Sequence, residues 1–544
     1  MNKILESSFM KYILTAVFLM FGIGLGYSQN TKEIDELLST YEKANQFSGS
    51  VLVAKKGKII FEKSYGYRNA ENGEKNTNNS QYKIFSTTKM FTATVILKLV
   101  EQGKLSLDNK LSKYYSDFPK ADSITIKNML SHTSGIPEAE DSENTKNEET
   151  FLKYITSKKL DFSPGKNWGY SNSNYYLLGY IIKKVTGLEY DKAIEEFILK
   201  PLKMTASGFH FNQLKSENKA VGYEFIDGKN SNRALLFKTD HPFAAGAIYS
   251  TVGDLYKFSE ALYGGKIISK QMVERMYTPY LNDHYGLAQE IYKTPNSDII
   301  QVGHGGGGPG YKCRFVKDLK NDITIIILIN SEMISAKAAD NITDIIYNRP
   351  YTAMSKNRID AKDLQKLQGI YSFNSENYYI NAINGTVVLN GGGIPRMPLA
   401  PITKIDYKLF ENFDLKFNAD NTGKIESVTI TNTQGTKTAK KIADIFSWGI
   451  IGTATPSGWE GKDIVLETQK SNPDFYYLKN YKLKTGELRF RSNNDWANSL
   501  GLNSDDKSMC YDGYNIIIKE DGFYDIVLDL SIKSKPQYSV KKVN

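Results

Sequence analysis

Residues 86–100 read Ser-Thr-Thr-Lys-Met-Phe-Thr-Ala-Thr-Val-Ile-Leu-Lys-Leu-Val, and the fold follows from this stretch more than from any other. Ser86 and Lys89 open a run that predicts a long helix beginning at about Ser86. Its apolar residues surround the helix almost completely, which is typical of a helix buried in the centre of a domain. Lys89 lies one turn after Ser86 on the same face, so its amine can reach the serine hydroxyl.

This pair of residue types indicates acyl transfer. A serine hydroxyl is a poor nucleophile at neutral pH and needs an adjacent base. A buried lysine can lose its proton near neutral pH, because desolvation disfavours the charged form. The start of the helix also directs backbone N–H groups towards an anion. We therefore predict that Ser86 is the nucleophile and Lys89 its base.

Two later motifs complete the predicted site. Tyr170-Ser171-Asn172 lies in a turn-rich loop. Tyr170 would take part in proton transfer between the serine hydroxyl and the leaving group, and Asn172 would hold Lys89 and a substrate amide. His304-Gly305-Gly306 lies in a glycine-rich run that precedes a predicted strand.

The glycines of this run, Gly306 and Gly307 among them, would let a substrate approach the strand backbone closely. A backbone N–H near Gly307 could join the Ser86 N–H as an oxyanion hole. His304 and these glycines are therefore the predicted substrate-binding residues.

At these motifs the chain resembles the class C β-lactamase and penicillin-binding family of serine hydrolases, whose wider group carries Ser-x-x-Lys with two further motifs. The likeness covers roughly residues 33–350. Three further stretches support it: residues 130–137 (Leu-Ser-His-Thr-Ser-Gly-Ile-Pro), 162–165 (Phe-Ser-Pro-Gly) and 244–254. The resemblance implies an α+β catalytic domain that works through an acyl-enzyme.

His304 departs from the pattern of many relatives, which carry lysine at this position. Such a lysine provides a fixed positive charge for a substrate carboxylate, whereas histidine is mostly neutral at pH 7. We therefore expect weaker capture of carboxylated β-lactams. A D-amino-acid peptide, a carboxylic ester and a β-lactam all stay open as substrates.

Composition excludes several other functions. The 544 residues carry a formal net charge of +9 with 24% charged residues, and no basic cluster indicates a nucleic-acid partner. The two cysteines, Cys313 and Cys510, fall in different predicted domains, which argues against a disulfide. No metal-ligand spacing is present. We expect neither metal nor cofactor, and the oligomeric state stays open.

The first 28 residues predict a signal peptide. Lys3 and Lys11 flank an uncharged run over residues 12–25, and small residues at Gly26 and Ser28 suit cleavage after Ser28. Export to the periplasm or the extracellular space follows. The alternative is an uncleaved N-terminal membrane anchor, because the uncharged run approaches the length of a membrane span.

The catalytic domain is predicted over residues 30–350. Strands are expected at 50–53 and 58–63, and again at 299–302, 311–317 and 323–330, with helices between the two groups. This order predicts an antiparallel sheet closed by both termini, with a helical subdomain beside it and the site at their junction.

Two small all-β domains are predicted to follow. Short strands with glycine-rich turns over residues 360–440 resemble a lipocalin-like β-barrel. Residues 442–544 resemble the β-sandwich modules of the SusE and SusF outer-membrane proteins of Bacteroidetes. Trp459 and Trp496 could stack on sugar rings, but a place in the core is the favoured prediction. We expect this last module to fold alone, to be dispensable for chemistry, and to be where any glycan or envelope contact lies.

The leading hypothesis is an exported serine hydrolase that acts through a Ser86 acyl-enzyme on an amide or ester. The alternative is a catalytically silent protein that uses the same scaffold to bind cell-wall or glycan ligands. The intact set of three motifs argues against the alternative.

Overall fold

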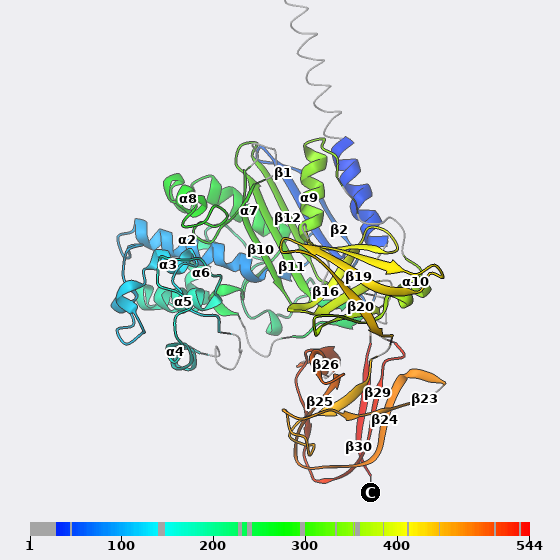
Figure 1. Ribbon diagram of the computed structural model, residues 1–544. Coiled ribbons are helices and arrows are strands. Elements are labelled where there is room, and N and C mark those ends of the chain that lie inside the picture. Colours follow the sequence, from blue (N-terminus) through cyan, green and yellow to red (C-terminus); the bar gives the residue numbers. More distant parts are fainter. Residues whose placement is uncertain are drawn as a thin grey trace, which may run out of the picture.

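A six-stranded antiparallel sheet forms the centre of the first domain (Figure 1). The computed structural model describes residues 29–43, 46–139, 147–226, 231–236, 242–293, 300–331, 335–351, 353, 359–383, 386–410, 413–444, 446–469, 471–504, 508–532 and 535–543. The sheet order is β2-β1-β12-β11-β10-β9. The strands are β1 (Gly49–Lys55), β2 (Lys58–Tyr65), β9 (Glu290–Lys293), β10 (Ile300–Gly308), β11 (Tyr311–Asp318) and β12 (Ile323–Ile329).

The two faces of this sheet are buried by different helices. Because side chains alternate along a strand, Val51 and Val53 face one core, whereas Leu52 and Ala54 face the other. The first core contains helical residues of 29–43 together with α9 (Ser335–Ile346). The second contains the helices of the inserted region, which begins after β2. A sheet buried on both faces explains why β12 is apolar at every position except Thr324.

The buried helix predicted from residues 86–100 lies at the centre of the second core. It is α2 (Thr88–Glu101), preceded by the single 3₁₀ turn η1 (Phe85–Thr87). Nearly all of its residues from Thr88 to Leu99 are buried. The other helices of the inserted region are η2 (Leu111–Lys113), η3 (Ala121–Ser123), α3 (Ile126–Leu130), α4 (Glu148–Thr156), α5 (Asn172–Thr186), α6 (Tyr190–Ile194), η4 (Glu195–Leu199), η5 (Phe211–Gln213), η6 (Phe243–Ala245), α7 (Val252–Tyr263) and α8 (Lys270–Tyr277).

Three short antiparallel strand pairs lie in the inserted region, separate from the central sheet. They are β3 with β4, β5 with β8, and β6 with β7. Their bounds are β3 (Tyr67–Asn69), β4 (Glu74–Lys75), β5 (Tyr82–Lys83), β6 (Tyr223–Phe225), β7 (Asn232–Arg233) and β8 (Tyr249–Ser250).

Eight antiparallel strands, β13 to β20, close into a barrel after the short helix α10 (Ala361–Leu367). Leu364 and Leu367 of this helix pack into the barrel core. The strands are β13 (Gly369–Phe373), β14 (Glu376–Ile383), β15 (Thr386–Gly391), β16 (Ile394–Pro401), β17 (Asp406–Phe410), β18 (Phe413–Ala419), β19 (Ile425–Asn432) and β20 (Gly435–Ala443).

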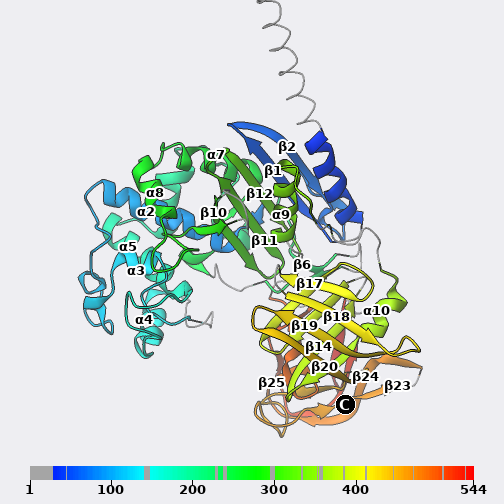
Figure 2. The same cartoon turned by 45° about the horizontal axis from the view of Figure 1, so that its top comes forward.

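Two further antiparallel sheets end the chain. One has the order β22-β21-β25-β26-β27, with β28 paired to β25, and the other has the order β23-β24-β29-β30. Figure 2 shows the barrel strands beside the strands of these sheets, as Figure 1 does from the first view. The strands are β21 (Trp448–Ile451), β22 (Ile464–Val465), β23 (Glu467–Gln469), β24 (Asn472–Leu483), β25 (Gly486–Ser492), β26 (Asp495–Leu502), β27 (Met509–Tyr511), β28 (Ile516–Ile518), β29 (Gly522–Asp529) and β30 (Gln537–Val543).

The predicted architecture is confirmed: an α+β domain with an antiparallel sheet and a helical region is followed by regions built of strands. One detail differs, because the His304 motif lies inside β10 and not ahead of a strand. The predicted signal peptide over residues 1–28 lies outside the described residues. Across the chain segments that the structure describes, no helix combines the length and apolar character needed to cross a bilayer.

The tryptophan prediction for the last module is wrong for Trp496, which is 42% exposed, and Trp459 is only half-buried. Trp448 fills the core instead. Trp496 lies on β26, where the alternation of the strand turns its side chain outwards.

The last module is less isolated than the sequence predicts. Its core includes Ile370 and Tyr379 of the barrel. Asn503, which is 3% exposed, contacts the catalytic domain: its Oδ1 accepts a hydrogen bond from Leu236 N (2.9 Å) and its Nδ2 donates to Ala234 O (2.7 Å). Ala234 in turn packs on Gly310, in the turn between β10 and β11. Asn503 therefore connects the last module to the hairpin that carries the third motif.

We predict that Asn503→Ala loosens this junction. The substitution leaves the backbone groups of Leu236 and Ala234 without partners, which costs about 1–3 kcal/mol. Amide hydrogen exchange measured over residues 231–236 should accelerate, whereas Asn472→Ala, which removes a hydrogen bond within the module (to Ser531), should leave that segment unchanged. Equal exchange in both variants would show that the contact carries no stability.

Candidate active site

The η1 turn, which carries Ser86, packs closely against β10. Phe85, directly before Ser86, has φ +43°, a strained conformation for a bulky residue. A Cβ added to Gly306 would lie 2.0 Å from the carbonyl oxygen of Ile84, and one added to Gly308 would lie 2.3 Å from the Phe85 ring. We expected a substrate to approach the backbone closely at Gly306. Instead, the residues at the start of the η1 turn lie there, and Gly306 and Gly308 leave the room that this turn needs.

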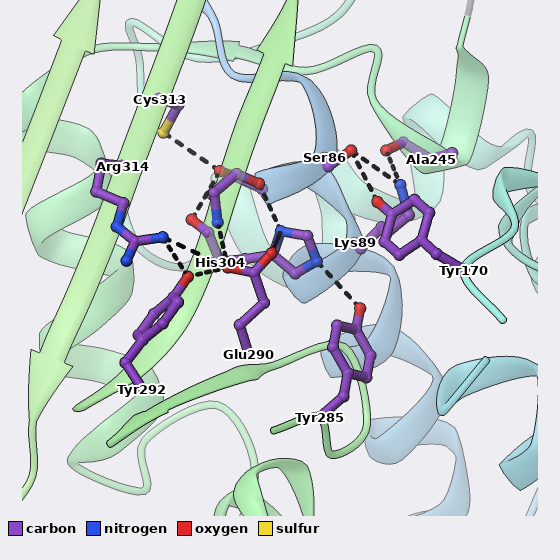
Figure 3. A network of polar contacts seen from close by, with 12 residues as sticks. Ser86, Lys89, Tyr170, Ala245, Tyr285, Glu290, Tyr292, His304, Cys313 and Arg314 are labelled. Carbon is purple, nitrogen blue, oxygen red and sulfur yellow. Dashed lines mark hydrogen bonds and ion pairs between the residues drawn. The ribbon is translucent and has the colours of Figure 1, made fainter. Parts of the chain in front are cut away.

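Lys89 lies beneath Ser86 and is fully buried (Figure 3). Its Nζ is 3.1 Å from Ser86 Oγ, 2.6 Å from Asn172 Oδ1 and 2.9 Å from Ala245 O. Burial lowers the pKa of Lys89 to about 7, although the charges of Glu138 and Glu290 oppose that shift. In the neutral amine, the two hydrogens satisfy Asn172 and Ala245, and the lone pair faces the serine hydroxyl. This is the geometry of a general base.

Tyr170 approaches the nucleophile from the other side. Its hydroxyl donates to Ser86 Oγ at 3.0 Å. Although 39% of the residue is exposed, the surroundings of the hydroxyl raise the pKa of Tyr170 through burial, with smaller contributions from Glu290 and Glu138. The phenol therefore keeps its proton near neutral pH. Lys89 is the better base of the two, and Tyr170 is placed to donate a proton to a leaving group.

Asn172 is held by Glu138, a residue that sequence reasoning missed. The Glu138 carboxylate accepts from the Asn172 backbone N–H (2.5 Å) and from its side-chain Nδ2 (2.7 Å). Because the Asn172 NH₂ group faces Glu138, its oxygen faces Lys89. Glu138 follows the Leu130–Pro137 stretch directly, so that stretch was the signal that could have indicated it.

His304 is nearly inaccessible, with 1% of its side chain exposed. Its Nδ1 contacts the Gly305 carbonyl and therefore carries the hydrogen, and its Nε2 accepts from the Tyr285 hydroxyl at 3.0 Å. Burial lowers the pKa of His304, which Glu290 opposes and Lys89 reinforces. The ring is thus neutral at pH 7, and each of its two nitrogens has a hydrogen-bond partner.

The edge of β10 beyond Gly303 carries the remaining predicted groups. The pairing of β9 with β10 ends at Gly303, and the Gly305 N–H points away from β11 towards Glu290. Because backbone groups alternate along a strand, the Gly307 N–H points to the same edge. A Cβ at Gly307 would meet nothing closer than Lys312 Cδ at 3.4 Å. This placement suits the oxyanion role predicted for Gly307.

His132 supports the loop that carries Tyr170. Its Nδ1 accepts from the Ser171 N–H at 3.1 Å, and its ring lies 4.3 Å from the Tyr170 ring. Burial is the main cause of the lowered pKa of His132. His132 therefore acts as a structural hydrogen-bonding group. His132 and Phe243 also have positive φ angles (57° and 44°), so strained backbone surrounds the site, as it does at Phe85.

Metal binding finds no support in the described segments, where no group of three or more His, Cys, Asp or Glu residues could hold an ion. Cys313 and Cys510 are both buried and unbonded to each other.

Comparison with known proteins agrees with this geometry. The family model described as Beta-lactamase matches residues 34–346. The chain therefore belongs to the β-lactamase/transpeptidase-like family and is homologous to penicillin-binding proteins.

Individual relatives extend the comparison. PbpX of Bacillus subtilis is 33% identical over 307 residues, covering 56% of this chain and 76% of PbpX. The octameric penicillin-binding protein homologue from Pyrococcus abyssi has a TM-score of 0.53 at 24% identity, covering 75% of this chain and 99% of that one. The D-amino acid amidase of Ochrobactrum anthropi has a TM-score of 0.51 at 22% identity, covering 59% and 98%. The last two show likeness of fold.

Family membership supports a serine hydrolase that acts through an acyl-enzyme. The resemblance of residues 442–544 to SusE and SusF modules stays a prediction.

We predict an acidic limb in the pH dependence of turnover. Only the neutral Lys89 amine can accept the Ser86 proton, so kcat/KM for an uncharged ester should rise with pH through about 7 and then level off. Lys89→Arg should abolish turnover, because a guanidinium stays protonated. A profile that is flat between pH 5.5 and 8.5 would exclude Lys89 as the base.

Proposed function

We propose that the protein is an exported serine hydrolase that forms an acyl-enzyme at Ser86 and cleaves an amide or ester. The observation that carries this proposal is the position of Ser86 Oγ, 3.1 Å from the Lys89 amine and 3.0 Å from the Tyr170 hydroxyl. One neighbour takes the proton from the nucleophile and the other supplies one to the leaving group. Export rests on the predicted signal peptide alone.

Three substrate classes fit this chemistry: D-amino-acid peptides, carboxylic esters and β-lactams. The relation to penicillin-binding proteins supports a D-amino-acid peptide or a β-lactam as acyl donor. The neutral state of His304 weakens the case for the carboxylated β-lactams. A peptide or ester substrate is therefore favoured within the proposal.

We predict that Ser86→Ala abolishes covalent labelling by a fluorophosphonate or a penicillin probe, together with turnover of p-nitrophenyl esters and D-Ala-D-Ala peptides. The label needs the serine oxygen, so no residual reaction is expected. Ser157→Ala, which removes an exposed serine from the end of α4, is the matched control and should label fully. Full labelling of the Ser86→Ala variant would refute the proposal.

A second candidate function is glycan binding by the last module. Trp459 and Trp496 lie together, with ring centroids 5.9 Å apart and planes inclined by 47°. The Arg491 guanidinium lies 4.6 Å from the centre of the Trp496 ring and supports it from one side. Paired, partly exposed indole rings provide an apolar platform for a sugar ring.

We predict that the double substitution Trp459→Ala, Trp496→Ala weakens binding to insoluble peptidoglycan or starch at least about fivefold, the loss expected for one aromatic contact. Phe523→Ala removes another exposed aromatic ring of the same module, 47% exposed, and should leave binding unchanged. A sedimentation assay measures both. Equal retention of the double variant and the parent protein would dismiss this candidate.

A further inference from the structure

The Glu290 carboxylate lies at the open edge of β10, beside the third motif (Figure 3). Glu290 is the first residue of β9 and pairs with Gly303. Its Oε2 accepts from the Gly305 N–H at 3.2 Å, and its Oε1 is 3.7 Å from His304 Nδ1. The carboxylate thus occupies the strand edge at the point where the pairing of β9 ends.

The positive charge beside this carboxylate belongs to Arg314, and it is already paired with Glu290. Arg314 Nη1 is 3.5 Å from Glu290 Oε2, and it also donates to the Tyr292 hydroxyl at 2.6 Å. The guanidinium stacks on the Tyr292 ring, 3.8 Å from its centre, and Tyr292 in turn donates to Glu290. Arg314 is therefore tied to Glu290 both directly and through Tyr292, and it balances an internal charge.

Three other basic groups lie near this end of the site. Lys312 pairs with Gly307, and its Nζ would be 3.7 Å from a Cβ at that position, but this lysine already takes part in an interaction of its own. Both ring nitrogens of His304 are engaged, as shown above. Lys89 is buried beneath Ser86 and held by Asn172 and Ala245. Glu138 adds a second carboxylate next to Asn172. At Gly305, a charged substrate group would therefore meet the Glu290 carboxylate, whose nearest cation, Arg314, is already paired with it.

A substrate can reach this carboxylate. The Glu290 side chain is 29% exposed. Gly305 has no side chain to shield it, and a Cβ at this position would still be 3.7 Å from both Glu290 Oε2 and Arg314 Nη1. If the acyl carbonyl of a substrate lies at Gly307, a substituent that extends along β10 reaches Gly305 and the Glu290 carboxylate beside it. Gly305 is two residues away, about 7 Å along the strand.

We propose that Glu290 selects substrates by charge, admitting amides and esters that carry an ammonium group within about 7 Å of the scissile carbonyl and rejecting those that carry a carboxylate there. This inference rests on the proposed hydrolase function. The ammonium donates to Glu290 Oε1, whereas a carboxylate at the same place meets a like charge without a free cation. The favoured substrates are amino-acid or peptide derivatives with a free amine.

Two matched substrate series test the proposal, because the charged group can lie on either side of the scissile bond. The first is D-alanine p-nitroanilide with its amine free, acetylated or succinylated. The second is N-acetyl-D-Ala-D-Ala with its C-terminus as a carboxylate, an amide or an aminoethylamide. The readout is the ratio of kcat/KM for the ammonium substrate to that for the carboxylate substrate, in which any general loss of activity cancels.

In the parent protein, this ratio should exceed about tenfold in at least one series. Glu290→Gln keeps an oxygen that can accept from Gly305 N and removes the charge. We expect it to lower the ratio about 100-fold, because the ammonium substrate loses about tenfold and the carboxylate substrate gains about tenfold. Glu274→Gln, which removes a charge on α8 outside this network, is the matched control and should keep the parent ratio.

Two results would overturn the proposal. One is a preference of the parent protein for the carboxylate substrate in both series, which needs no variant to be folded. The other is a ratio in Glu290→Gln within threefold of the parent value in both series, measured on protein that the Ser86 probe labels stoichiometrically. Absence of labelling and of turnover for every substrate, the neutral ones included, would instead refute the hydrolase function and the inference with it.

Discussion

The burial of one amine is the constraint on which the site depends. Lys89 lies in the first turn of α2, which is buried between the sheet and the other helices. Desolvation there lowers the pKa of Lys89 to about 7. Its two acceptors come from separate segments, Asn172 at the start of α5 and Ala245 in η6. The base therefore exists only when helix, loop and turn are assembled together. Folding the catalytic domain and preparing the nucleophile are one process.

Close packing sets the position of the nucleophile with equal strictness. The η1 turn fits against β10 because Gly306 and Gly308 have no side chains, and Phe85 accepts a positive φ to place Ser86 over Lys89. Such a conformation costs about 1–3 kcal/mol, which the surrounding contacts must offset. Thr87 contributes to that offset, because its buried hydroxyl lies 3.3 Å from the His304 carbonyl oxygen and 3.2 Å from Cys313 Sγ. This close packing fixes the distance between Ser86 and the edge of β10 at Gly307.

Local patterns predicted the elements, whereas long-range partners escaped prediction. The helical periodicity after Ser86 and the strands around residues 50–63 were readable, because apolar spacing follows from local geometry. The pairing of Ser86 with Lys89 followed from their spacing on one helix face, whereas no local pattern places Tyr170, 84 residues away, beside them. Glu138 and Glu290 were missed. Glu138 directly follows a recognisable stretch, but nothing local marks Asn172 as its partner, and Glu290 reaches the site through the pairing of β9 with β10. The exposure of Trp496 was missed for a related reason, because the face that a strand buries depends on which sheet covers it.

Chemistry and substrate choice occupy different parts of this site, but one charge links them. Ser86, Lys89 and Tyr170 belong to the helical region and its loops, whereas Glu290 and Arg314 belong to the sheet edge. The negative charge of Glu290 raises the pKa of Lys89 against the effect of burial. Under the proposal, a substrate ammonium at Glu290 adds a positive charge on this side of the site, so it lowers the pKa of Lys89 and leaves more of the amine as the free base at neutral pH. The proposal therefore implies that binding of the favoured substrate class also prepares the base, which would couple selection at the strand edge to the reactivity of Ser86.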